Sequence, residues 1–552
     1  MIGAYSADQV RAAERPALAA GMGAELMSRA AFAVAQQTLG LLRSQRGRLA
    51  GSRAVALVGK GNNGGDGLWT LTFLARRGLA VTALLMEETC HREGLAALRA
   101  AGGTVLWLSG APGPEDGAAS PAEARALCLR SDVVIDAILG TGARGGLRGL
   151  AAELVSALAE DQRVPGYLPP VVACDIPSGV DAGTGECSGP VLRATLTVTF
   201  VGAKAGLFLP PGAQSCGRIS VVPLGVEAAL GEPLVRRLES EDLGELLPRP
   251  SANGHKYTRG VLGVVAGSEE YPGAAVLACS GALAAGAGMV RYYGPPPVAA
   301  LVSSVLPEVV CHSGTAVPGR VQAWLLGPGV SGGEQLARCR AALAQELPTV
   351  LDAGALHLLN EGIAGRADLV LTPHAGELAE LLGRFGQPRE RSVVEARALD
   401  SLRDAVRLSG CTVLLKGPQT LTGSPDGAIH SQADGTPWLA TAGSGDVLAG
   451  VLGALLAQAP PSSPDAETTE VPGRWARVAA LAAAVHGRAG RIATGESSGG
   501  SGRPVTARDV ARAVPLVWDE TSHDRSPDVT SAGYGEPSGR SDPTRRQSAW
   551  RT

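Results

Sequence analysis

Lysine is scarce in this sequence. Of its 49 basic residues only four are lysine, Lys60, Lys204, Lys256 and Lys416, which leaves 45 arginines. Arginine carries a wide planar fork, whereas lysine is a compact, flexible charge whose pKa shifts readily in proteins. All four lysines lie in glycine-rich motifs. We interpret them as candidates for chemical roles in binding sites, with a chance distribution as the alternative.

Other features are also missing from the chain. Its nine cysteines include no CxxC pair, and its N-terminus lacks the basic flank and apolar run of a secretory signal. No stretch reaches the roughly 18 strongly apolar residues that a membrane span requires. We therefore expect a soluble, cytoplasmic protein with no membrane partner. The net charge of -3 gives no electrostatic footprint for nucleic acid, so none is expected as a partner either.

Length and periodicity predict two α/β domains. The 552 residues exceed one ordinary domain of roughly 100 to 200 residues. From about residue 50 to 225, short Val/Leu/Ile runs alternate with segments of helical period, and the same rhythm restarts near residue 259. Strands that alternate with helices indicate mostly parallel sheets.

The segment between the two rhythms, 226–254, carries acidic residues, prolines and Asn-Gly, and is predicted to lack strands. From about residue 521 the chain is too poor in apolar residues to fold. We therefore predict an N-terminal domain, a linker, a C-terminal domain and a disordered tail over residues 1–228, 229–250, 251–520 and 521–552.

A glycine loop follows the first predicted strand of the N-terminal half. The strand AVALVG runs into GKGNNGGDG, residues 59–67, and then into a helix. Backbone N–H groups in such a loop can bind a phosphate, and GxGxxG spacing alone is a weak sign of dinucleotide binding. An ordinary dinucleotide loop does not need Asn-Asn or Gly-Gly-Asp. These polar side chains suggest oxygen ligands for a cation or a substrate.

Two more predicted strands end in similar chemistry. VVIDAILGTG places Asp136 at a strand end, and VVACDIPSG does the same for Asp175 and Ser178. Because ligands in open α/β sheets bind beyond the carboxyl ends of the strands, these strand ends predict one crevice. Each aspartate alone could instead cap a turn or a helix. Lys204, in GAKAGL, could reach the crevice or only bond loop carbonyls.

Together, GxGNNGGDG, IDAILGTG and DIPSGVD resemble the YjeF N-terminal family of NAD(P)H-hydrate epimerases. The resemblance implies a Rossmann-like domain that inverts C6 of the hydrated nicotinamide, with Asp175 and Lys204 moving protons or polarising the hydroxyl. It also implies a potassium ion bound by Asn63, Asp136 and Ser178. Besides Asp175, it implies these substrate-binding residues: Asn62, Asn63, Gly64, Gly65, Asp66, Gly140, Thr141, Gly142, Ala143, Arg144, Gly145 and Gly146.

The C-terminal half has its own glycine-rich turn. AGSGD, residues 442–446, follows a predicted strand PWLA and opens a long apolar helix. The N–H donors and positive dipole end of such a turn can stabilise a transferring phosphoryl group, and Asp446 can accept a proton from an attacking hydroxyl. Capping the helix is the alternative role for Asp446. LLKGPQT places Lys416 at another strand end, and TPHAGE places His374, which could be only a capping or surface histidine.

These motifs, with HKYTRG and AGSEEYPGAA, resemble the ribokinase-like fold and its branch of ADP- or ATP-dependent NAD(P)H-hydrate dehydratases, although AGSGD stands where GGTGD is commoner. The resemblance implies that Asp446 activates the C6 hydroxyl for phosphorylation, with Mg²⁺ neutralising the nucleotide, and that phosphate then leaves. Residues implied to contact the hydrate are Ala275, Gly329, His374 and Asp446. Residues implied to hold the nucleotide are Lys416, Gly417, Pro418, Gln419, Thr420 and Gly445.

The tandem resemblance implies one repair enzyme. Its first domain would interconvert R- and S-NADHX or NADPHX, and its second would dehydrate the S form with ADP, favoured over ATP, releasing AMP and phosphate. We also expect a homo-oligomer. The alternative is a vitamin-precursor kinase fused to a non-catalytic binding domain, which AGSGD fits but TPHAGE and the intact N-terminal motifs do not.

Overall fold

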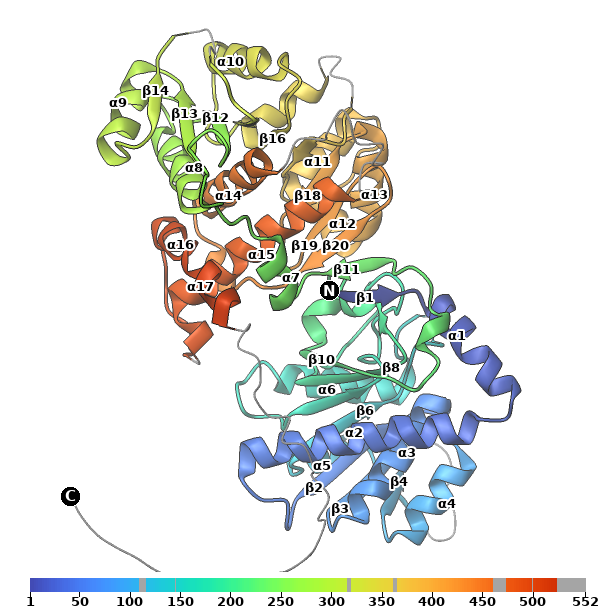
Figure 1. Cartoon of the computed structure of the whole chain (residues 1–552). Helices are drawn as coiled ribbons and strands as arrows, with labels where there is room; N and C mark the ends of the chain where they lie inside the picture. The colour runs from blue at the N-terminus through green and yellow to red at the C-terminus, as the bar shows by residue number, and fades with distance from the viewer. Residues whose placement is uncertain are drawn as a thin grey trace, which may run out of the picture.

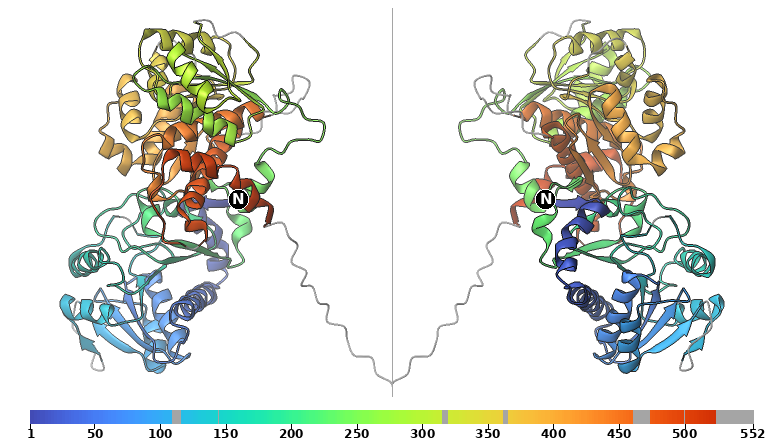
Figure 2. Two further views of the ribbon diagram at one scale, coloured as in Figure 1. Left: turned by 90° about the vertical axis from the view of Figure 1, so that its left-hand side faces the viewer. Right: turned by 90° about the vertical axis from the view of Figure 1, so that its right-hand side faces the viewer.

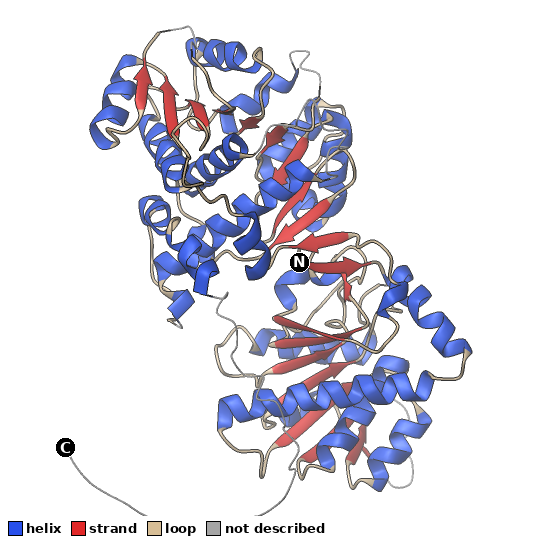
Figure 3. Ribbon diagram, in the orientation of Figure 1, coloured by secondary structure: helices blue, strands red, loops and turns tan. Residues whose placement is uncertain are grey.

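The computed structural model describes residues 1–108, 116–143, 145–314, 319–360, 365–459, 473–498 and 500–523. It has two α/β lobes, with helices packed on both faces of the sheets (Figures 1 and 3). The expected α/β class with parallel sheets is confirmed. Within the described residues, no helix is long and apolar enough to cross a membrane.

The N-terminal lobe is built on an 8-stranded parallel sheet. Its order is β10 (Arg218–Val222), β8 (Leu196–Phe200), β7 (Val171–Cys174), β6 (Val133–Ala137), β2 (Arg53–Val58), β3 (Ala80–Leu85), β4 (Thr104–Trp107) and β5 (Gly117–Ala118). Successive residues of a strand face opposite sides, so Ala54 and Ala56 pack in one core and Val55 and Leu57 in another. Helices of the first core are α1 (Ala7–Ala19), α2 (Gly23–Arg46), α3 (Asn62–Ala75) and α4 (Arg92–Ala100); those of the second are α5 (Pro121–Leu129) and α6 (Gly149–Asp161).

The C-terminal lobe contributes most of a 12-stranded sheet, parallel from β14 to β18 and antiparallel from β18 to β20. Its strands here are β14 (Val310–His312), β13 (Met289–Tyr293), β12 (Val261–Val265), β15 (Ala323–Leu326), β16 (Thr349–Leu351), β17 (Leu369–Leu371), β18 (Thr412–Leu415), β19 (Thr420–Gly423) and β20 (Ile429–Gln432). One core includes α8 (Pro272–Ala284), α9 (Pro296–Val305), α14 (Ser444–Gln458), α15 (Arg474–Thr494) and α16 (Ala507–Ala513). The other includes α10 (Gly333–Leu343), α11 (Ala375–Arg384), α12 (Arg391–Ala396) and α13 (Ala398–Ser409).

The predicted strand PWLA is wrong, because Pro437–Leu439 forms a 3-10 helix. Proline has no N–H to give to a strand ladder and its fixed φ suits the first residue of a helical turn. The Thr436 hydroxyl accepts the N–H of Trp438 and starts that turn. AGSGD therefore follows a helical turn instead of a strand.

The 12-stranded sheet crosses from one lobe to the other. Beyond β20 it continues through β11 (Val235–Arg237), β1 (Ile2–Tyr5) and β9 (Ala203–Lys204). The chain's first residues thus lie where the two lobes meet (Figure 2). One hydrophobic core holds side chains from both sides of this junction, among them Phe208 and Leu421.

The expectation that 226–254 lacks strands is wrong at β11, which carries a single apolar residue, Val235, and therefore gives little strand signal. Helix α7 (Ser240–Leu246) follows it, and Asp242 in this helix pairs with the amino group of Met1 at 2.7 Å. The predicted domain limits stay predictions. The predicted disordered tail lies outside the described residues, except for the end of α17 (Leu516–His523).

Candidate active sites

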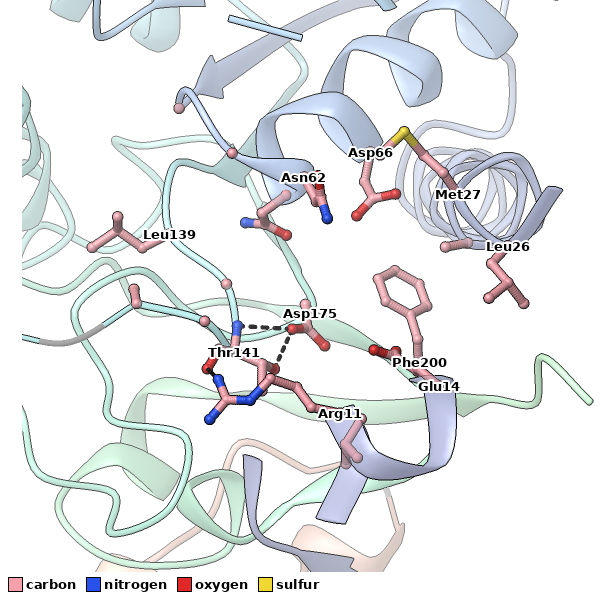
Figure 4. A pocket seen from close by; sticks show the side chains of 18 of the residues that line it. Arg11, Glu14, Leu26, Met27, Asn62, Asp66, Leu139, Thr141, Asp175 and Phe200 are labelled. Atoms are coloured by element: carbon pink, nitrogen blue, oxygen red, sulfur yellow. Dashed lines mark hydrogen bonds between the residues drawn. The ribbon is translucent and has the colours of Figure 1, made fainter. Parts of the chain in front are cut away.

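Three strands of the N-terminal sheet end around one cavity of about 590 Å³. Strand β2 leads into the glycine loop and α3, β6 leads into the loop at 138–143, and β7 leads into Asp175. Helices α1 and α2 complete the wall (Figure 4). Of the residues predicted to act on or bind the substrate, those that line the cavity are Asn62, Asn63, Asp66, Gly140, Thr141, Gly142, Ala143, Asp175 and Lys204.

The other glycines of this predicted set shape the loops and do not line the cavity. A Cβ at Gly64 or at Gly146 would collide with a backbone carbonyl, so each glycine permits a close approach of two backbone segments. A Cβ at Gly65 would lie 3.0 Å from Met27 and from His91. Gly145 has a φ of 77°. Arg144 lies outside the described residues.

Asp175 and Lys204 form a buried ion pair at this cavity, with 2.5 Å between Lys204 Nζ and Asp175 Oδ1. The ammonium also donates to the Thr199 hydroxyl at 3.0 Å and to the Phe200 carbonyl at 2.9 Å. Asp175 accepts the backbone N–H of Thr141 at 3.0 Å and its hydroxyl. Burial acts to raise the pKa of Asp175, but Lys204 and Thr141 outweigh it and lower the pKa. Asp175 is therefore held in its charged form.

Asp136 and Ser178, two of the predicted potassium ligands, contact each other directly. The Ser178 hydroxyl donates to Asp136 Oδ1 at 2.6 Å and its backbone N–H donates to Oδ2 at 2.8 Å. The third, Asn63, has a buried amide whose oxygen and nitrogen have no hydrogen-bond partner among the described residues. A Cβ at Gly140 would lie 3.1 Å from the Asn63 side chain, and the neighbouring Leu139 N–H donates to the Ser178 hydroxyl at 2.9 Å, so the loop after β6 contacts both residues. Burial raises the pKa of Asp136, although Ser178 opposes the shift.

Helix α1 brings two charged residues to the cavity, Arg11 and Glu14, that no motif predicts. The helix buries Val10, Ala13 and Ala17, an apolar stripe at intervals of three and four residues. Glu14 follows Ala13 and lies at the edge of that stripe. This position is the signal in the sequence that could have indicated a half-buried carboxyl.

In the C-terminal lobe, Asp446 lies in the first turn of α14 but does not cap the helix. The N-cap is Gly443, with a φ of 84°, and no side-chain hydrogen bond closes this helix end. The alternative role of Asp446 as a cap is therefore wrong. Burial and the nearby charge of Asp352 raise the pKa of Asp446 to about 7, with Lys416 opposing the shift. A carboxyl of this kind can exchange a proton near neutral pH.

Lys416 follows β18 and faces the same carboxylates. Its Nζ lies 2.8 Å from Asp352 Oδ1 and 3.7 Å from Glu377 Oε2. A Cβ at Gly445 would lie 3.8 Å from the same nitrogen, which brings the AGSGD turn to Lys416. Burial acts to lower the pKa of Lys416, but Asp352 and Glu377 outweigh it and raise the pKa. Three carboxylates and one cation therefore lie around the start of α14.

His374 caps α11. Its Nδ1 accepts the N–H of Glu377 at 3.1 Å, and the Glu377 carboxylate accepts the N–H of His374 at 2.8 Å. This is the capping role that the sequence left open, and a parallel bridge also joins His374 to Lys416. The imidazole itself is largely exposed, since 58% of its side-chain surface is accessible. It therefore stays available to a ligand.

The remaining predicted contacts lie on α8 and on the turn after β18. Ala275 is buried in α8. Gly329 has a φ of 61° and lies close to Ala274, the residue that precedes Ala275 in this helix. The turn Gly417–Thr420 has exposed residues at Gly417 and Pro418. Within it, the side-chain oxygen of Gln419 is buried and has no hydrogen-bond partner among the described residues.

The fold and the two sites define a class of proteins in which a Rossmann-like domain precedes a ribokinase-like domain. Residues 23–206 match the family model of the YjeF-related protein N-terminus, and residues 262–509 match that of NAD(P)H-hydrate dehydratase. The chain belongs to the family of bifunctional NAD(P)H-hydrate repair enzymes, and the resemblance read from its motifs is confirmed.

The similarity to these relatives extends over most of each chain. The bifunctional NAD(P)H-hydrate repair enzyme Nnr of Mycobacterium tuberculosis is 42% identical over 464 residues, 83% of this chain and 90% of that one. Its counterpart in Moorella thermoacetica is 32% identical over 523 residues, 89% and 92% of the two chains. A solved ADP/ATP-dependent NAD(P)H-hydrate dehydratase from Bacillus subtilis, co-crystallized with ATP and Mg²⁺, is 27% identical. The match covers 52% of this chain and 99% of that chain, with a TM-score of 0.43.

Proposed function

We propose that this chain repairs hydrated NADH and NADPH at two sites. The N-terminal site interconverts the R and S hydrates, and the C-terminal site dehydrates the S hydrate with ADP as phosphoryl donor. The observation that carries the proposal is the pairing of two sites in one chain of this family: a polar cavity around Asp175 and Lys204, and a proton-exchanging Asp446 at a glycine-rich helix start.

In the dehydratase reaction, Asp446 takes the proton of the C6 hydroxyl as its oxygen attacks the terminal phosphorus of the nucleotide. Phosphate is a far better leaving group than hydroxide, so it departs from C6 and loss of a C5 proton restores the dihydropyridine ring. Lys416 and the Gly417–Thr420 turn hold the nucleotide, and Gly445 lets its phosphates approach α14. Ala275, Gly329 and His374 orient the hydrate.

Magnesium fits this site as a companion of the nucleotide. Among the described residues, no group of three or more His, Cys, Asp or Glu side chains could hold a metal ion by itself. Mg²⁺ is commonly bound by one or two carboxylates together with substrate phosphates, and the Asp352 carboxylate lies at the site. When bound, the ion would neutralise the charge on the transferring phosphoryl group.

The pH dependence of dehydration should report on Asp446. Below about pH 7 the carboxyl is protonated and cannot accept the hydroxyl proton; above that pH it is ionised and can. We therefore expect kcat/KM for the S hydrate to rise with pH through about 7. Asp352→Asn removes one cause of the raised pKa and should move the midpoint to lower pH. A midpoint that stays in place in this variant would contradict the assignment.

In the epimerase reaction, the Asp175–Lys204 pair fixes charge beside C6 and polarises its hydroxyl. The residues of the two glycine loops that line the cavity, Asn62, Asn63, Asp66 and Gly140–Ala143, bind the phosphate-bearing part of the substrate. A potassium ion fits next to them, since Asn63 has an unpartnered buried amide oxygen and Asp136 and Ser178 supply hard oxygen donors. When bound, the ion would add positive charge near those phosphates.

Thermal unfolding tests the potassium site without an activity assay. A ligand that binds only the folded state raises the melting temperature, so K⁺ in place of Na⁺ should stabilise the wild type. Asn63→Ala should lose this response. Asn62→Ala is the matched control, because Asn62 is exposed at the neighbouring position and should leave the response intact. Equal K⁺ responses in Asn63→Ala and the wild type would remove Asn63 from the site.

Product analysis separates this proposal from the kinase alternative. With mixed hydrates and ADP, we expect reduced-nicotinamide absorbance to return with one AMP and one phosphate for each NADH formed. A kinase would instead keep the phosphoryl group on its product. NADH recovery without AMP would contradict ADP as the donor. The cytoplasmic location and the homo-oligomer stay predictions.

A further inference from the structure

Inversion at C6 needs groups that give and take protons, and the Asp175–Lys204 pair is poorly arranged for this. Each proton of the Lys204 ammonium has an acceptor in the protein, on Asp175, Thr199 and Phe200. Asp175 in turn accepts hydrogen bonds from Lys204, Thr141 and Thr199. A proton moved to or from either residue would break these bonds. The pair is suited to fixing charge, and the proton exchange requires other groups.

Glu14 is held over the same cavity by the strand that carries Lys204. In the β1–β9 ladder, Tyr5 is paired with Lys204. The next residue, Ser6, caps α1 by accepting the N–H of Gln9 at 3.2 Å, and the Gln9 side chain donates to the Glu232 carbonyl at 2.7 Å. Helix α1 is therefore fixed at its start. Glu14, about two turns further on, lines the cavity together with Lys204.

Asp66 reaches the cavity from α3 and Glu14 reaches it from α1. Asp175 lines the same cavity (Figure 4). Neither Glu14 nor Asp66 has a side-chain hydrogen bond to the described residues, in contrast to Asp175. Arg11, one turn before Glu14, donates to Asp8 at 2.6 Å and to the Thr141 carbonyl at 3.5 Å. Its guanidinium is thus engaged elsewhere.

The charges around the two carboxyls favour proton uptake. Burial raises the pKa of Glu14 and Asp175 raises it further, against the opposing charges of Lys204 and Arg11. Burial also raises the pKa of Asp66 well above its usual value, with Asp175 and Glu14 adding to the shift and Lys204 opposing it. The other charged side chains that line the cavity are Lys60 and Glu87. The negative charges of Glu14 and Asp175 thus favour the protonated form of Asp66.

We propose that Glu14 and Asp66 are the acid and base of the epimerase site, and that Glu14 is a catalytic residue outside the motifs of the glycine loops. This inference rests on the proposed epimerase function. In one direction, Glu14 gives its proton to the C6 hydroxyl, the C6–O bond breaks and the oxygen departs as water. The N1 lone pair forms an N1=C6 iminium. Water then adds to the opposite face of C6 and gives its extra proton to the Asp66 carboxylate. The reverse direction starts from the proton distribution that this leaves.

Glu14→Gln tests the proposal, because it keeps the size and polarity of the side chain and removes its titratable proton. With mixed hydrates and ADP, the S hydrate should be consumed at the wild-type rate by the C-terminal site. The R hydrate should then be consumed about 10²- to 10³-fold more slowly than in the wild type, through a lower kcat and with KM little changed. Glu14→Asp, which retains a carboxyl, should recover part of the rate.

Glu25→Gln is the matched control, since Glu25 lies at the start of the neighbouring helix with 52% of its side chain exposed. Glu25→Gln should leave the rates of S-hydrate and R-hydrate consumption unchanged. If the wild type does not interconvert the epimers, the proposed function fails. If the wild type does and Glu14→Gln matches it, only the inference about Glu14 fails.

Two further measurements separate proton transfer from a structural role. The wild-type epimerase rate should fall on both sides of a pH optimum, because one carboxyl must be protonated and the other ionised. The residual rate of Glu14→Gln should lose this bell shape, and a uniform fall at every pH would overturn the proposal. In ¹⁸O-labelled water, the wild type should place label on C6 with each inversion. Retention of the original oxygen would overturn the C6–O cleavage step.

Discussion

Replacing Asp446 with asparagine should slow dehydration of the S hydrate by about 10²- to 10⁴-fold and leave the R/S interconversion unchanged. Asparagine keeps the shape of the side chain but cannot accept the hydroxyl proton. The loss should appear in kcat, because no contact with the nucleotide or with the hydrate ring is removed. Absorbance of the reduced nicotinamide, with purified S hydrate and saturating ADP, measures it.

The control for Asp446→Asn is Asp400→Asn, at a partly exposed position of α13 that pairs with Arg397 on the protein surface. This variant should keep the wild-type rate. An Asp446→Asn variant with kcat within a few-fold of the wild type would remove Asp446 as the base. It would then leave the raised pKa of this carboxyl as a consequence of burial alone.

Replacing Asp175 with asparagine should abolish rapid consumption of the R hydrate and also destabilise the N-terminal lobe. Lys204 would be left as a buried cation, with only 2% of its side chain exposed and no counter-ion. Breaking one partner of a buried pair costs about 3 to 5 kcal/mol in unfolding free energy. Denaturant unfolding measures the stability. The rate at which the R hydrate is consumed, in the assay with mixed hydrates and ADP, measures the epimerase activity.

The double variant Asp175→Asn/Lys204→Met separates the two effects. Removing the orphaned cation should restore part of the lost stability, since a neutral pair carries no uncompensated charge. The epimerase should stay inactive. Glu160→Gln, on the exposed surface of α6, is the control that should change neither quantity. An active double variant would show that the charged pair is dispensable for inversion.

Sequence motifs predicted which residues meet at each site because parallel strands end at the same edge of a sheet. Asp175 follows β7 and Lys416 follows β18, so their positions came from the strand pattern alone. Glu14 was missed because it lies in a helix without a glycine motif, and its role depends on the position of α1 at the wall of the cavity. Periodicity shows which face of α1 is buried but not what covers it.

The continuous sheet between the lobes was not predicted, because its connecting strands are short. β11 and β9 contain too few residues for an alternating pattern, and they form only because β20 and β1 offer open edges to pair with. The scarcity of lysine was informative only in part. Lys204 and Lys416 form close ion pairs at the two sites, whereas Lys256 is exposed and lies 5.3 Å from the Tyr257 ring.

The fate of purified R-NADHX, incubated with the intact chain, ADP and Mg²⁺, tests the central claim most directly. If one chain holds both activities, the R hydrate should return fully to NADH, much faster than it epimerises without enzyme, with AMP and phosphate formed in equal amounts. If the chain converts S-NADHX to NADH but leaves R-NADHX to its spontaneous rate, the account of the N-terminal site is wrong.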